Sequence, residues 1–273
     1  MARTKSQHHP LPSGAGEVLA GRSPLRQRTL VDTVIDALIS GVTSGVVLPG
    51  DRIIEADLAQ RLGVSRVPIR EALRILESQG LLVSEPYKGI RLTPVTPKRL
   101  DDLIEARVAL ETMAAVRMIR EGRNGEAEIG VLMRCVDQLE RMQARNDLFG
   151  FANADINFHR VLCRLSGNEV VCELWERLAC QTTVFFGLST LVKPMTEIVD
   201  EHRTLIDALR SGNIDAITSA IREHIGEQMR RVNFEGVINR LREERSVEGA
   251  DQTARIVDYA DRAKPASRLR GAR

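Results

Sequence analysis

The stretch GVSRVPIREAL, Gly63 to Leu73, decides the fold of the first part of the chain. Gly63 can adopt the left-handed conformation that ends a helix, and Ser65 can cap the next helix with its hydroxyl. Pro68 then falls in the first helical turn, where its missing N–H breaks no hydrogen bond. The stretch therefore predicts two helices joined by a tight turn, a helix-turn-helix.

The second of these helices has an apolar stripe and a basic face. The stripe consists of three residues at helical spacing, Ile69, Leu73 and Leu76. The basic face consists of three arginines four residues apart, Arg66, Arg70 and Arg74. Arginine near a helix N-terminus opposes the helix dipole unless an anion is close, and a DNA phosphate or a guanine edge supplies one. The alternative is a solvated surface on which these arginines pair with Glu71, Asp57 or Glu77.

The sequence on both sides of this helix-turn-helix predicts a winged domain. Leu30, Val34, Leu38 and Val42 recur at helical spacing and predict a helix before it, followed by a turn at VVLPGDRI. After Gly80, the segment LLVSEPYKGIRLT contains two short β-prone runs around a turn and predicts a hairpin. Residues 26–95 are therefore predicted to form a winged helix-turn-helix, which places its second motif helix in the DNA major groove.

Residues 96–245 read as an all-α bundle. Apolar residues recur there at helical spacing, and polar or Gly- and Pro-containing segments interrupt the pattern five times. These breaks predict about six helices. The mixed polar segments 1–25 and 246–273 lack such periodicity and are predicted to be a flexible arm and a flexible tail.

The composition narrows the class of protein. The chain has 273 residues, 43% of them hydrophobic and 3% aromatic, which favours a mainly α protein packed through aliphatic side chains. Its formal charge of +2 gives no global argument for a nucleic-acid or membrane partner. The four cysteines form no CxxC pair, and no apolar run is long enough to span a bilayer. We therefore expect a reduced, cytoplasmic protein without a membrane partner.

Four residues of the second block have the chemistry of a metal site. Asp155 and His159 are four apart and share one helix face, while His202 and His224 each lie on a separate predicted helix. Three imidazoles and a carboxylate suit Zn, Ni, Fe or Mn and leave positions for water or a ligand carboxylate. The alternative is that these are ordinary core or surface histidines. The spacing lacks HExxH, so a zincin protease is not supported.

The first block resembles a known family. LPGDRIIEADLAQRLGVSRVPIREALRILESQGLL, followed by EPYKGIRL, is similar to the N-terminal domain of GntR-family bacterial transcription regulators. The resemblance implies that Arg66 and Arg70 contact the operator, with Ser65 and Pro68 in the same recognition-helix N-terminus. It places Lys88 and Gly89 at the tip of the wing. Some relatives carry a further arginine where this chain has Ala56, so one contact is absent or moved here.

The second block resembles the FCD ligand-binding domain of the FadR subfamily of these regulators, through ARVALE, ADINFHRVL, SGNEVVCELWERL and EHRTLIDALRSGN. The resemblance implies that Asp155, His159, His202 and His224 hold a divalent metal. It also implies that Arg107 lies in an effector pocket, where its guanidinium would pair with the carboxylate of a small organic acid. The alternative for Arg107 is a salt bridge to Glu105, Glu111 or another acid of the bundle.

These observations lead to one expectation and two rivals. We expect a homodimer that binds a palindromic operator, in which a small carboxylate metabolite relieves repression. The first rival is a metal-dependent, hydrolase-like enzyme that uses the Asp/His3 site, with Glu201 or Glu223 as a base. Each of these acids is adjacent to a ligand in sequence and is therefore expected to point about 100° away from the metal. The second rival is an architectural DNA binder without an effector.

Overall fold

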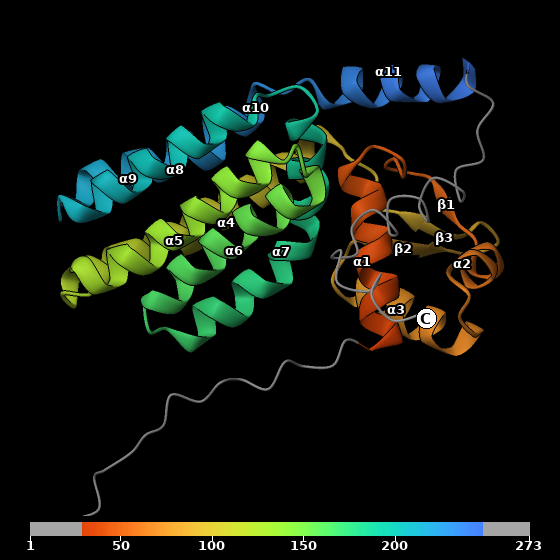
Figure 1. Cartoon of the computed structure of the whole chain (residues 1–273), viewed down its shortest axis with the longest axis horizontal. Helices are drawn as coiled ribbons and strands as arrows, with labels where there is room; N and C mark the ends of the chain where they lie inside the picture. Colours follow the sequence, from red (N-terminus) through yellow and green to blue (C-terminus); the bar gives the residue numbers. More distant parts are fainter. Residues whose placement is uncertain (1–28, 248–273) are drawn as a thin grey trace, which may run out of the picture.

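The computed structural model describes residues 29–247 and contains a small N-terminal unit beside a helical bundle (Figure 1). The predicted arm 1–25 lies outside the described residues, as does most of the predicted tail 246–273. We call residues 29–93 the head. Its elements are α1 (Leu30–Thr43), β1 (Arg52–Ile53), α2 (Glu55–Leu62), α3 (Arg66–Ser78), β2 (Leu82–Glu85) and β3 (Gly89–Leu92).

The helix-turn-helix forms as predicted, with one difference in its capping. Gly63 ends α2 in the left-handed conformation, at φ 65°. Ser65 occupies the N-cap position of α3, but its side chain makes no capping hydrogen bond, so the predicted role of its hydroxyl is wrong. Pro68 is buried together with Ile69 and therefore helps to anchor the start of the helix in the core.

The wing has one strand more than the sequence predicted. β2 and β3 form the predicted antiparallel hairpin, with Glu85 opposite Gly89. β1 adds to the other edge of β3, so the strand order is β1-β3-β2. The segment that contains β1 was predicted only as a turn. Two residues are too few to show an alternating pattern, which explains why this strand was missed.

The bundle confirms the predicted mainly α architecture, and its helices end at the predicted breaks. Pro97 begins the first of them, because Thr96 caps the helix and proline is tolerated in its first turn. The bundle helices are α4 (Pro97–Arg120), α5 (Glu126–Ala144), α6 (Leu148–Leu165), α7 (Glu169–Thr190), α8 (Met195–Arg210) and α9 (Ile214–Ile221). Without a break, α9 continues through a π-helical segment, η1 (Arg222–Glu227), into α10 (Gln228–Arg230).

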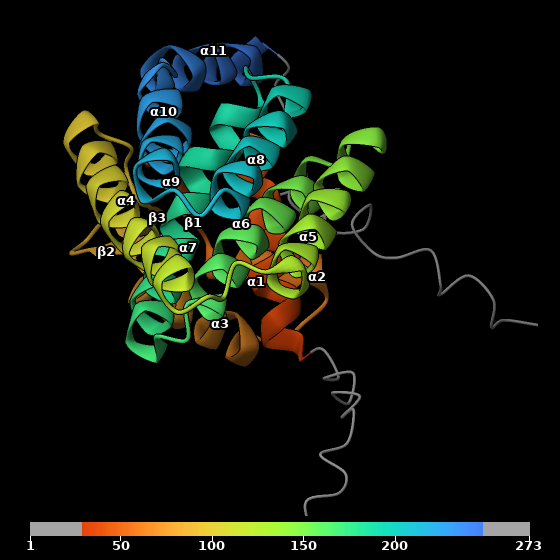
Figure 2. The same ribbon diagram turned by 90° about the vertical axis from the view of Figure 1, so that its left-hand side faces the viewer.

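A last helix, α11 (Phe234–Val247), leaves the bundle and runs along the head (Figures 1 and 2). Phe234, Val237 and Ile238 are buried in the apolar cluster that also contains the core of the head. No helix among residues 29–247 is long and apolar enough to cross a membrane.

The head packs on the bundle through a close contact between α1 and α7. Val184, Phe185 and Leu188 of α7 belong to the same apolar cluster as the head. A Cβ on Gly187 of α7 would lie 2.7 Å from Cα of Thr43 in α1. The absence of a side chain at Gly187 therefore sets how closely the two units approach.

Replacing Gly187 by alanine should destabilise this contact. The new methyl group meets backbone, which cannot move aside as a side chain can, so we expect a loss of about 1–3 kcal/mol in the free energy of unfolding. Gly130 in α5 is the matched control, since a Cβ there meets only Arg134 Nη1 at 3.6 Å. Gly130→Ala should be neutral or stabilising. Equal effects of the two substitutions in denaturant unfolding would contradict the close α1–α7 contact.

Candidate functional site

The basic face of α3 is exposed to solvent. Arg66, Arg70 and Arg74 are all exposed. Arg66 forms no ion pair or hydrogen bond with another described residue, whereas Arg70 Nε lies 2.9 Å from Glu55 Oε2. An exposed ion pair of this kind contributes only about 0–1 kcal/mol, so an anion can displace it. Pro68 was included in the predicted DNA-contacting set, but it is buried and does not lie on this face.

The tip of the wing projects an aromatic and a basic side chain. Tyr87 has φ 64° and is fully exposed. Lys88 is also exposed and pairs with Glu85 at 2.9 Å, while Gly89 begins β3 with φ 80°. The wing tip therefore presents a cation to solvent from the hairpin, as α3 presents its arginines.

Inside the bundle, Asp155, His159, His202 and His224 converge from three helical segments. Asp155 and His159 lie on α6, His202 on α8 and His224 on η1, and their ligand atoms all lie within 4.8 Å of one another. His202 Nε2 lies 3.2 Å from Asp155 Oδ1, and Nε2 of His159 lies 3.3 Å from Nε2 of His224. The structure thus brings together all four residues that the sequence selected.

The outer nitrogen of each imidazole faces an acceptor. Nδ1 of His159 lies 2.5 Å from Glu111 Oε2, and Nδ1 of His202 lies 2.7 Å from the carbonyl of Ile198. Nδ1 of His224 lies 3.1 Å from Glu201 Oε2. Since carboxylates and carbonyls accept hydrogen bonds, each Nδ1 is assigned the proton. The three Nε2 lone pairs therefore point at one another, an arrangement that a cation stabilises.

The charge state of the cluster is suited to a cation. Burial, together with the neighbouring His202 and His159, lowers the pKa of His224 to about 4, so this imidazole is neutral at pH 7. Burial alone would raise the pKa of Asp155. The three histidines lower it by a larger amount, so the net shift of this pKa is downward. Both oxygens of Asp155 and Nε2 of His202 are buried without a hydrogen-bond partner among the described residues. Such groups are costly to bury unless a ligand satisfies them.

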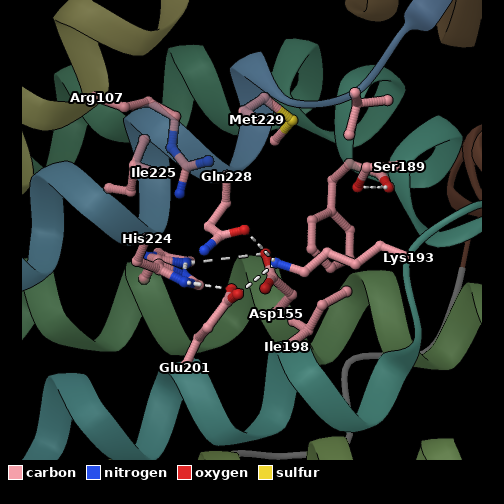
Figure 3. Close-up of a pocket in the computed structure, with 13 residues that line it drawn as sticks. Arg107, Asp155, Ser189, Lys193, Ile198, Glu201, His224, Ile225, Gln228 and Met229 are labelled. Atoms are coloured by element: carbon pink, nitrogen blue, oxygen red, sulfur yellow. Dashed lines mark hydrogen bonds and ion pairs between the residues drawn. The ribbon is translucent and has the colours of Figure 1, made fainter.

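Arg107 combines the two roles that the sequence left open. Its Nε donates to Glu111 Oε1 at 3.0 Å, so the predicted alternative of a salt bridge within the bundle is present. Its Nη2 is buried and has no partner among residues 29–247. Arg107 also lines the cavity beside Asp155 and His224 (Figure 3). One side of the guanidinium is therefore used by the bundle, and the other remains available to an anion.

Glu111 joins this arginine to the histidine cluster. It is fully buried and also accepts a hydrogen bond from Nε1 of Trp175, at 2.9 Å. Burial would raise the pKa of Glu111, but Arg107, His159 and Trp175 together hold it well below its usual range. Glu111 was considered in the sequence only as one partner of Arg107, and its contact with His159 was missed.

The cavity has further polar residues that the sequence analysis missed. Lys193 donates to Glu201 and, at 3.2 Å, to Gln228 Oε1. Lys193 and Arg107 approach the cavity from opposite sides (Figure 3). They come from helices or loops that are far apart in the sequence, and no spacing rule links them.

The prediction that Glu201 points away from the cluster is wrong. The adjacent side chains Glu201 and His202 do diverge on α8. Members of the cluster lie on both of the segments that these two side chains face, α6 and η1. His202 faces Asp155 on α6, whereas Glu201 faces His224 on η1. Glu223 behaves as expected, since it contacts Gln228 and Arg231 and is half exposed.

The cysteines stand apart from this site. Burial raises the pKa of Cys163, and it raises the pKa of Cys180 to about 12, so both remain protonated thiols. Cys135 is also buried, and Cys172 is partly buried. This is the behaviour of inert core thiols and not of metal-binding thiolates.

Comparison with known proteins assigns a family to both parts of the chain. Residues 30–92 match the family described as bacterial regulatory proteins, gntR family, and residues 102–227 match the FCD domain. A transcriptional regulator from Agrobacterium vitis is 34% identical over 166 residues, which is 59% of this chain and 91% of that protein. A probable D-xylose utilization operon transcriptional repressor from Paenarthrobacter nicotinovorans is 26% identical over 201 residues, 74% of this chain and 88% of that protein.

A solved structure supports the same fold. E. coli McbR/YncC superposes with a TM-score of 0.60 at 22% identity, over 78% of this chain and 99% of that one. The relatives are regulators and not enzymes, so the metal-dependent hydrolase is not supported. With the winged head, the FCD bundle and these relatives, the chain belongs to the GntR family of bacterial transcription regulators, in the FadR-like branch that carries an FCD domain.

Proposed function

We propose that this DNA-binding regulator is a homodimeric repressor whose operator affinity is controlled by a small organic acid bound beside a metal in the bundle. The observation that carries the proposal is the buried cluster of unsatisfied groups. Both Asp155 oxygens, Nε2 of His202 and Nη2 of Arg107 are buried without a hydrogen-bond partner among residues 29–247. Asp155 and Arg107 line one cavity, and Nε2 of His202 lies 3.2 Å from Asp155 Oδ1. A cation would satisfy the first three groups, and a carboxylate would satisfy Arg107.

For the metal, the donor set supports a divalent transition ion such as Zn, Ni, Fe or Mn. Asp155, His159, His202 and His224 would hold it through one oxygen and three nitrogen atoms. Bound there, the ion would supply a positive charge and open coordination positions for an oxygen ligand. Glu111, Glu201 and the Ile198 carbonyl would orient the three imidazoles.

For the effector, the cationic groups of the cavity support an acid. Nη2 of Arg107 lies on one side, and the ammonium group of Lys193 lies on the other. Ser189 and Gln228 add groups that can bind hydroxyls. Sugar acids and dicarboxylates both fit this chemistry. Two relatives, from Bacillus licheniformis and Bacillus subtilis, are named gluconate operon transcriptional repressors, and gluconate is a sugar acid, so sugar acids are the first choice.

For DNA, two heads related by twofold symmetry would bind the two halves of a palindromic operator. Arg66, Arg70 and Arg74 would enter the major groove, and Lys88 would contact the flanking backbone. The bundle exposes three apolar side chains on α4 and α7, Met113, Val170 and Leu174. Their exposure supports pairing between two chains.

Removing the recognition arginines should weaken operator binding. Arg66→Ala and Arg70→Ala each remove a group that can bind guanine or phosphate, at a cost of about 1–3 kcal/mol, or roughly 5- to 150-fold in Kd. Lys98→Ala is the control, since Lys98 is an exposed cation of α4 outside the head. The Kd is measured by fluorescence anisotropy on DNA selected in vitro by the wild-type protein. Unchanged binding by both arginine variants would refute the assignment of α3 as the recognition helix.

The metal site should respond differently to two neighbouring glutamates. Glu201→Gln weakens the acceptor of His224 Nδ1 and should lower metal affinity about 10- to 100-fold. Glu223→Gln, next to His224 but directed outward, should leave the affinity unchanged. His202→Ala, which removes a ligand, should abolish stoichiometric binding. Zinc titration against a competing chelator measures all three. Equal affinities for wild type and His202→Ala would exclude the site.

The effector is expected to stabilise the wild-type protein in a thermal-shift screen of sugar acids and dicarboxylates with added zinc. A ligand at a hundred times its Kd adds about 2.7 kcal/mol, which raises Tm by roughly 5–10 °C. Arg107→Lys keeps a charge beside Glu111 but loses the second donor, and should lose most of the shift. Arg120→Lys, an exposed arginine on the same helix, should retain it. A shift that is equal in Arg107→Lys and wild type would contradict the role of Arg107.

A further inference from the structure

The cavity beside the metal site is too small for the proposed effector as it stands. Its volume is about 30 Å³, which leaves room for only a few water molecules. Pockets for small organic ligands are typically about 300–1,000 Å³. An organic acid can therefore bind only if part of the wall moves.

The wall is not equally anchored on all sides. Arg107 and Asp155 lie on the long helices α4 and α6, inside the bundle. A single segment supplies five other lining residues, His224, Ile225, Gln228, Met229 and Val232. This segment contains the π-helical turn η1, a wider and less common geometry than the α-helix that is often found at functional sites. Within this segment His224 is held by Glu201, so residues 225–232 are the part of the wall best suited to move.

This same segment leads directly into α11, which is attached to the head. Arg245 makes a two-pronged ion pair with Asp51, at 2.7 and 3.1 Å, and its Nη1 also donates to the carbonyl of Val46 at 3.2 Å. Arg242 donates to the carbonyl of Pro49 at 2.7 Å. We call these contacts between α11 and residues 46–51 the clasp. The Arg245–Asp51 pair is largely buried, with 19% and 13% of the two side chains exposed.

The clasp holds the edge of the wing. The Asp51 carboxylate also accepts a hydrogen bond from the Leu48 amide, at 2.8 Å, and the Asp51 carbonyl accepts one from the Leu92 amide, at 2.9 Å. Leu92 ends β3, and Arg52 begins β1. A shift of α11 would therefore act on β1 and β3, which are joined to Asp51 at the clasp.

The joint between α11, the linker and the head has room for such a shift. A groove of about 740 Å³ that opens to solvent lies between them, lined on the head side by Pro49 and Gly50, on the linker by residues 94–97 and on α11 by Phe234 and Ile238. The clasp thus lies beside a groove into which side chains of α11 and the head can move.

We propose that α11 couples the effector cavity to the DNA-binding head: an occupant of the cavity displaces residues 225–232 and thereby opens the Arg242/Arg245 clasp. This inference rests on the proposed function, because it concerns the regulation of the same cavity. The clasp lies partly beyond the residues that match the two families, 30–92 and 102–227. Opening the clasp lowers operator affinity by freeing the head.

The first test is hydrogen exchange of the amides of residues 46–52 in the full-length chain. Arg245→Ala should raise their exchange rates about tenfold or more, because the two-atom ion pair of Arg245 with the Asp51 carboxylate beside the Leu48 amide is lost. Arg240→Ala is the matched control, an exposed arginine of α11 whose ion pair within residues 29–247 is with Glu244, at 3.8 Å. Ser189→Phe places a bulky group in the cavity from the α7 wall and should raise the same exchange rates as Arg245→Ala. Unchanged exchange in Arg245→Ala would overturn the clasp.

The second test compares operator affinities in a double-mutant cycle. Ser189→Phe and Arg245→Ala should each weaken operator binding, within the roughly 5- to 150-fold range typical of allosteric coupling. The double variant should bind the operator no more weakly than the more weakly binding single variant, since both substitutions act through the same contact. Arg240→Ala should bind as wild type does.

The outcomes separate this inference from the proposed function. Ser189→Phe could weaken operator binding equally in the wild-type background and in Arg245→Ala. In that case the cavity regulates the head by another route, such as α7, so the clasp is refuted and the proposed function is not. If Ser189→Phe leaves operator affinity unchanged in a protein that is folded by circular dichroism, regulation through this cavity is refuted, and the proposed function fails with it.

Discussion

The buried carboxylate of Glu111 is the interaction on which the site depends. It accepts hydrogen bonds from Arg107 on its own helix, from His159 on α6 and from Trp175 on α7. A buried charge is tolerated only when it is paired and hydrogen-bonded, and Glu111 meets this condition with three donors from three helices. The same contacts orient the imidazole of His159 toward the cluster and turn the second face of Arg107 toward the cavity. A single structural anion thus positions both the proposed metal ligand and the proposed effector-binding group.

The head is joined to this site by two structural connections. Helix α7 presents Phe186 and Ser189 to the cavity and Gly187 to Thr43 of α1. The segment that carries His224 continues into α11, which reaches Asp51 at the edge of the wing. Helix α7 contacts both the cavity and the head, and the segment that lines the cavity is followed directly by α11. A change in the volume of the cavity would therefore be transmitted through these helices to the DNA-binding surface.

Much of this arrangement was predictable from the sequence, because the informative features are local. Gly63 and Pro68 marked the helix-turn-helix, and the spacing of Asp155 and His159 placed both on one face of a helix. The remaining features depend on tertiary packing. The contact of Glu111 with His159 spans 48 residues, and that of Arg245 with Asp51 spans 194, so no periodic pattern contains them. Glu201 was misplaced because the direction of a side chain on one helix does not reveal which neighbouring helix it faces.

The central claim is that Asp155 and the three histidines form a metal site and not a set of core residues. X-ray absorption spectroscopy of the zinc-loaded protein tests it most directly, since it reports the atoms bound to the ion. The structure predicts a first shell of nitrogen and oxygen at about 2.0–2.2 Å, with the outer-shell scattering of imidazole rings. Sulfur scattering at about 2.3 Å, or a shell of oxygen alone without imidazole, would contradict the site.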